Sequence, residues 1–143
     1  MTDAIRYYCE KKKAELMVHW QGLSEAEIAQ EKEKLNEARE MIYSMYDLAR
    51  REGLLALEEL TGDLFSRKEA SEIEGAFKWM IELVVVGESP NIIEEMSFLR
   101  LFSDGYEGFE AALYMLYLYG ILMVQSWYED GEIRDEFDHL FSE

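Results

Sequence analysis

An uncharged stretch at residues 111–128 constrains the fold of this chain more than any other sequence feature. About eighteen apolar residues are the lower limit for a helix that crosses a membrane. This stretch contains four tyrosines, however, and acidic residues flank both of its ends with no basic cluster to mark a cytoplasmic side. A helix buried in a protein core explains these features better than a membrane span. We therefore expect a core helix at about residues 108–128.

Helix signals occur along the whole chain, whereas strand signals are nearly absent. Ser24 and Glu27 have the spacing of a capping box. Ser89 followed by Pro90 is typical of a helix N-cap and the first helical residue. Gly53 weakens a helix around it by about 1 kcal/mol relative to alanine, so we expect a kink or break there. In chain order, the expected helices cover about residues 3–21, 24–51, 54–60, 66–87, 89–103, 108–128 and 132–141.

Six to seven helices joined by short connections predict an all-α fold. We expect an antiparallel bundle built around the buried helix at 108–128. No linker rich in proline, glycine or serine interrupts the chain. Residues 1–143 are therefore expected to form a single soluble helical domain.

The chain is strongly acidic, with a formal net charge of -17 that is unevenly distributed. Residues 1–78 contain 12 Lys or Arg and 17 Asp or Glu, whereas residues 79–143 contain 2 and 14. Such a field repels nucleic-acid phosphates and anionic membrane surfaces. We expect no nucleic-acid partner and no membrane insertion, and a protein partner with a basic or mixed-charge surface. Solubility alone explains the charge equally well.

The cysteine content and the N-terminus indicate a cytoplasmic location. Cys9 is the single cysteine, so no intrachain disulfide can form, which fits a reducing compartment. The first residues lack the basic and then apolar pattern of a signal peptide.

Residue patterns that carry catalysis or bind metals are incomplete. A turn near residue 131 is similar to a calcium-binding loop, but Phe137 stands where that loop needs a glutamate. Glu136 and His139 have the spacing of a helical di-metal site, but the second such pair is missing. Cys9 and His19 lie ten residues apart, too far for thiolate activation. We therefore expect no enzyme activity, no metal and no cofactor.

The segment ARREGLLALE at residues 49–58 has an Ala-Arg-x-x-Gly-x-x-x-Leu-Glu pattern, carried by Ala49, Arg50, Gly53, Leu57 and Glu58. This pattern resembles the cytoplasmic domain of flagellar stator proteins of the MotA/TolQ/ExbB proton-channel family. The segments LVVVGESPNIIEE at 83–95 and GILMVQ at 120–125 are similar to later parts of the same domain. Together the similar segments cover about half of the chain.

The resemblance implies a fold and a contact surface rather than proton conduction. Stator proteins have four membrane spans, and their pore helices have no counterpart in this sequence. We therefore expect a soluble relative, or a fragment that lacks the membrane helices.

The resemblance also implies a contact site. In the flagellar family, the arginine and the glutamate of the first pattern contact charged residues of the rotor's switch protein, and they correspond to Arg50 and Glu58. Arg51 shares a face with Glu58 if the helix continues through Gly53. We expect a non-enzymatic protein–protein interaction module, with Arg50, Arg51 and Glu58 as partner-binding residues and the leucines between them in the core. The alternative is that these three residues are ordinary surface charges with no partner-binding role, in which case each ion pair contributes about 0–1 kcal/mol to stability.

Two other interpretations stay open. The chain could be a small-molecule-binding helical bundle with an aromatic and methionine-lined pocket, formed by Tyr114, Met115, Tyr117, Tyr119, Met123 and Trp127. Side chains of these types at helical spacing also form ordinary cores. A homo-oligomer is the other alternative.

Overall fold

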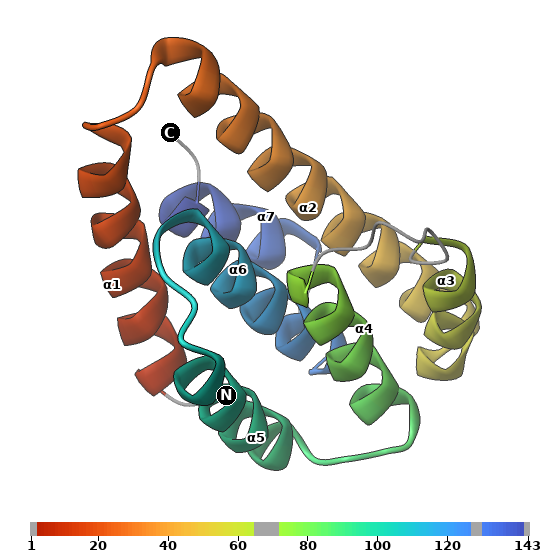
Figure 1. Ribbon diagram of the computed structural model, residues 1–143. Coiled ribbons are helices and arrows are strands. Elements are labelled where there is room, and N and C mark those ends of the chain that lie inside the picture. Colours follow the sequence, from red (N-terminus) through yellow and green to blue (C-terminus); the bar gives the residue numbers. More distant parts are fainter. Residues whose placement is uncertain (1–2, 65–71, 127–129, 142–143) are drawn as a thin grey trace.

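Helices make up nearly all of the computed structural model, which describes residues 3–64, 72–126 and 130–141. These residues form seven α-helices and one short 3-10 helix, and they contain no strand (Figure 1). The elements are α1 (Asp3–Trp20), α2 (Glu25–Glu52), the 3-10 helix η1 (Leu54–Ala56), α3 (Leu57–Leu64), α4 (Glu72–Val85), α5 (Pro90–Asp104), α6 (Gly108–Gln125) and α7 (Asp130–Phe141). The predicted all-α class is confirmed. The helix start expected at residues 66–69 lies outside the described residues.

Helix α6 is the centre of the bundle, as its uncharged sequence predicts. Every side chain from Ala111 to Val124 is buried, and α1, α2, α4, α5 and α7 all pack against this helix (Figure 1). A helix with apolar side chains on all of its faces is stable in water only when other elements bury every face. Among the described residues, α6 is also the helix that is long and apolar enough to cross a membrane, judged by length and composition alone.

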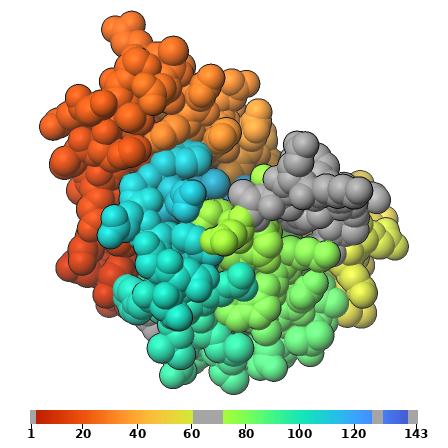
Figure 2. Space-filling model, in the orientation of Figure 1, coloured from red at the N-terminus to blue at the C-terminus, as the bar shows by residue number. Residues whose placement is uncertain are grey.

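The beginning of α6 reaches the surface in the view of Figure 2, where it appears in cyan between α1 and α4. Glu107 and Glu110 are exposed there, and Phe109 is half-buried. The charged residues that open the helix are therefore in solvent, whereas the apolar remainder lies in the core.

The local signals read from the sequence form the expected caps. The Ser24 hydroxyl accepts a hydrogen bond from the Glu27 amide at 3.2 Å, and the Glu27 carboxylate accepts one from the Ser24 amide at 3.3 Å. The Ser89 hydroxyl accepts from the Ile92 amide at 3.3 Å, with Pro90 as the first helical residue. These bonds satisfy backbone donors that have no partner within the helix.

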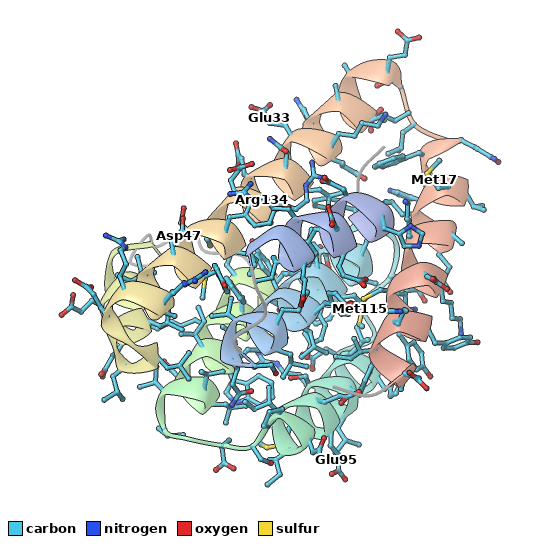
Figure 3. The ribbon with its side chains drawn as sticks, turned by 180° about the vertical axis from the view of Figure 1, so that it is seen from behind. Met17, Glu33, Asp47, Glu95, Met115 and Arg134 are labelled. Atoms are coloured by element: carbon cyan, nitrogen blue, oxygen red, sulfur yellow. The ribbon has the colours of Figure 1, made fainter. Side chains whose placement is uncertain are left out.

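Helix α2 changes character along its length. Glu33 and Asp47 point away from the bundle (Figure 3), and most side chains of the first half are exposed. Ile42, Met45 and Tyr46, in the second half, are buried against the core. The first half of α2 is thus solvated, whereas the second half belongs to the core.

Gly120 allows α2 and α6 to approach closely. A Cβ atom at this position would lie 2.7 Å from the Cδ1 and Cγ1 atoms of Ile42. Ile42 is fully buried, so it has little room to move away. The missing side chain at residue 120 therefore sets the spacing of the two helices.

Candidate partner-binding surface

Helix α2 ends at Glu52 and is capped by Gly53, in the middle of residues 49–58. Gly53 has φ 92° and ψ 165°, a conformation that a residue with a Cβ atom rarely adopts, and its amide donates to the Ala49 carbonyl at 2.8 Å. The chain continues as η1 and α3, so Arg51 and Glu58 lie on different helices. The expected break is confirmed, and the shared helical face of these two residues is not formed.

The two arginines occupy the last turn of α2 and are exposed. Arg50 Nη1 donates to the Tyr46 hydroxyl at 3.3 Å, and Arg51 Nε donates to the Asp47 carbonyl at 3.3 Å. Both bonds run back along the same helix. These two bonds orient the guanidinium groups beside the end of α2.

Glu58 lies in the first turn of α3 and is exposed. It lines a small cleft of about 90 Å³ together with Ile81 and Val85 near the end of α4 and with Val86, which follows that helix. The site that the sequence predicts therefore has its arginines on α2 and its carboxylate on α3, beside α4.

The charges also suit the helix ends on which they lie. The C-terminal end of a helix carries a partial negative charge and the N-terminal end a partial positive charge. Arg50 and Arg51 lie at the C-terminal end of α2, and Glu58 and Glu59 lie at the N-terminal end of α3. Each such placement stabilises a helix by roughly 0.3–1 kcal/mol, which gives these residues a local role besides any contact with a partner.

The leucines of this segment do not all enter the core. Leu57 is fully buried, and Leu54 and Leu60 pack partly against the core. Leu55 is 70% exposed, which contradicts its expected core position. The reason is local: Gly53 turns the chain, and the tight 3-10 turn that follows directs residue 55 outward. The surface between Arg51 and Glu58 thus contains an apolar side chain that the sequence pattern did not reveal.

The aromatic and methionine residues proposed for a ligand pocket pack as core side chains. Tyr114, Met115, Tyr117, Tyr119 and Met123 are all buried, and Trp127 lies outside the described residues. The Tyr117 ring stacks on Phe77 with a centroid separation of 4.0 Å. The Tyr114 hydroxyl donates to the Ser97 carbonyl at 2.6 Å, and the Tyr119 hydroxyl donates to Glu136 at 3.1 Å. Other side chains and backbone groups of the protein therefore pack around these residues, in the place where the sequence analysis proposed a ligand pocket.

The cysteine is chemically protected. Cys9 is fully buried, and its thiol lies 3.9 Å from the carbonyl oxygen of Met115. Burial raises the pKa of the Cys9 thiol well above its ordinary value, so the reactive thiolate is disfavoured. Within the described residues, no group of three or more His, Cys, Asp or Glu side chains is arranged to hold a metal ion.

A second, larger cleft of about 800 Å³ lies between α1, α2 and the start of α6. Carboxylates dominate its polar lining, and His19 Nε2 lies 3.6 Å from Glu31 Oε1 within it. Its lining residues are Lys12, Glu15, Val18, His19, Glu31, Glu107, Gly108, Phe109 and Glu110. Sequence reasoning missed this cleft because its residues come from three distant segments that only the tertiary fold brings together.

Comparison of the chain with protein-family models, with curated proteins and with solved structures gives no significant match.

Proposed function

We propose that this chain is a non-enzymatic helical module that binds a protein partner through Arg50, Arg51 and Glu58. The observation that carries the proposal is the junction of α2 and α3, where these three charged residues are all exposed on two adjoining helix ends. The stator-like pattern of residues 49–58 supports the same assignment independently of the geometry. The exposed Leu55 adds apolar area to the same stretch.

The chemistry of the three side chains defines the partner surface. A guanidinium has five N–H donors in a planar fork that suits a carboxylate, and each arginine uses one donor in the hydrogen bonds described above. The carboxylate of Glu58 is complementary to a Lys or Arg side chain on the surface of the partner protein. The complement is therefore a surface of mixed charge, with an acidic group facing α2 and a basic group facing α3.

The family resemblance suggests which partner to test first. If the chain works as the stator domain does, its partner is the switch protein of the flagellar rotor, and the contact forms in the cytoplasm. Charged contacts of this kind accelerate association at low salt and lose that advantage as salt screens them.

The test measures binding of the purified chain to the rotor switch protein from the same genome by isothermal titration calorimetry. The double variant Arg50→Asp/Glu58→Lys reverses both charges without altering the net charge. We expect its Kd to rise at least about tenfold, because two attractive contacts become repulsive.

The matched control is Glu33→Lys/Lys34→Asp, which makes the same net-neutral reversal on the exposed first half of α2. It should bind as tightly as the wild type. Equal weakening by both double variants would show a diffuse electrostatic effect and reject the surface. If the switch protein does not bind at all, the flagellar assignment fails, and a pull-down with the same two variants then tests the interaction surface alone.

A further inference from the structure

Helix α5 exposes an apolar stripe on the face that points away from α6. Ile92, Met96, Leu99 and Phe102 follow one another at spacings of four, three and three, which places them on one side of the helix. Leu99 is 64% exposed and Phe102 is 56% exposed. A single exposed apolar residue is ordinary, but four on one helix face form a patch.

The patch continues onto the beginning of α1, which lies beside α5 (Figure 1). The ring centroid of Tyr8 lies 5.0 Å from that of Phe98 and 5.6 Å from that of Phe102. Tyr7 packs edge-on against Tyr8 at 5.3 Å and is itself 59% exposed. Two helices therefore contribute to one apolar surface, which we call the α5 patch: Tyr7, Tyr8, Ile92, Met96, Phe98, Leu99 and Phe102.

An exposed carboxylate, Glu95, lies on the same side of α5 as the apolar stripe. Residues 86–107, which comprise α5 and its flanking turns, contain five carboxylates and one arginine, but Glu94 is buried and Glu107 lines the cleft beside α1 and α2. That arginine, Arg100, lies 4.9 Å from the Trp79 ring centroid and 3.4 Å from Asp104 Oδ2, so its charge is engaged. Glu95 extends outward from α5 (Figure 3). On the α1 side, the ammonium of Lys11 lies over the Tyr8 ring at 5.7 Å.

We propose that the α5 patch is a docking surface for a basic amphipathic helix of a partner protein. An apolar stripe with helical spacing matches a partner helix that carries its own anchors at i, i+3 or i+4 and i+7. Lysines or arginines beside those anchors would face Glu95. A second copy of the chain fits less well, because it would bring another strongly acidic C-terminal half against the first.

This surface is distinct from the junction of α2 and α3, so neither proposal depends on the other. A stator-like contact through Arg50 and Glu58 is electrostatic, whereas the α5 patch combines apolar burial with the charge of Glu95. The two surfaces call for different partner chemistry and respond to different substitutions.

The test uses a fluorescein-labelled synthetic peptide of about fourteen residues, or four helical turns, with leucines at helical spacing and lysines elsewhere. Fluorescence anisotropy measures its Kd for the wild type and for Leu99→Gln/Phe102→Gln. Both substitutions keep the charge and affect exposed side chains, so circular dichroism should show an unchanged fold. We expect the double variant to bind the peptide at least about tenfold more weakly, because apolar anchors dominate such contacts.

Two control peptides separate the components of binding. Glutamates in place of the lysines should abolish binding, and a shuffled sequence without helical spacing should weaken it as much as the double variant does. Equal affinity for the shuffled peptide would mean simple charge attraction and would overturn the proposal.

A matched protein control is Val18→Gln, which removes a side chain that is 66% exposed on α1 and that lines the acidic cleft. This variant should bind the peptide as the wild type does. If it loses as much affinity as the double variant, the cleft is the binding site and the proposal is wrong. The proposal is also wrong if the wild type does not bind the peptide. Light scattering that shows a wild-type dimer, lost in Leu99→Gln/Phe102→Gln, would identify a second copy as the occupant instead.

Discussion

At the scale of single residues, Gly120 has the largest structural consequence. Alanine there would place a methyl group 2.7 Å from two side-chain atoms of the buried Ile42. Overpacking of this kind costs about 1–3 kcal/mol, which exceeds the gain of up to about 1 kcal/mol from replacing a helical glycine. We therefore expect Gly120→Ala to lower the free energy of unfolding, measured by urea denaturation.

Gly75 provides the matched control for this substitution. It lies in α4 and is exposed, and within the described part of the chain no atom other than those of its own helix backbone and chain neighbours lies within 4 Å of the position that a Cβ would take. Gly75→Ala should raise the free energy of unfolding by up to about 1 kcal/mol, because only the helix propensity changes. If both alanine variants are stabilised alike, α2 and α6 do not pack as closely as described.

At the scale of elements, the sequence predicts those helix starts and breaks that depend on interactions between residues close together in the chain. The start of α2 at Ser24, the start of α5 at Ser89 and the break at Gly53 all follow from hydrogen-bonding groups or backbone freedom within a few residues. The exposure of Leu55 could not be predicted, because it depends on the turn geometry after Gly53. The acidic cleft could not be predicted either, since its members come from three helices.

The Ser24 cap should contribute measurably to stability, since the half of α2 that it opens has few buried side chains. Ser24→Ala removes the acceptor for the Glu27 amide and should lower the free energy of unfolding by about 1 kcal/mol. Ser44→Ala, at an exposed position inside the same helix, should leave stability unchanged or slightly raised. Urea denaturation of the two variants compares them directly, and equal effects would show that the cap is dispensable.

At the scale of the whole molecule, one buried helix organises the bundle, and it brings tyrosine hydroxyls into the interior. Burial is the main cause that raises the pKa of Tyr119 to about 12, and it raises the pKa values of Tyr114 and Tyr117 further. In the unfolded chain a tyrosine titrates near pH ~10. Between those values the unfolded state binds fewer protons than the folded state, so the stability falls as the pH rises.

We therefore expect cooperative alkaline unfolding above about pH 10, with the stability contribution of these hydroxyls intact below that value. Tyrosinate absorbance at 295 nm and helical circular dichroism should change together for the buried tyrosines, whereas in guanidinium chloride all tyrosines should titrate near pH ~10. Tyr117→Phe keeps the ring that stacks on Phe77 and removes one ionisable hydroxyl, so it should shift the alkaline midpoint upward. Tyrosine ionisation that is complete while the helical signal persists would contradict the buried arrangement of α6.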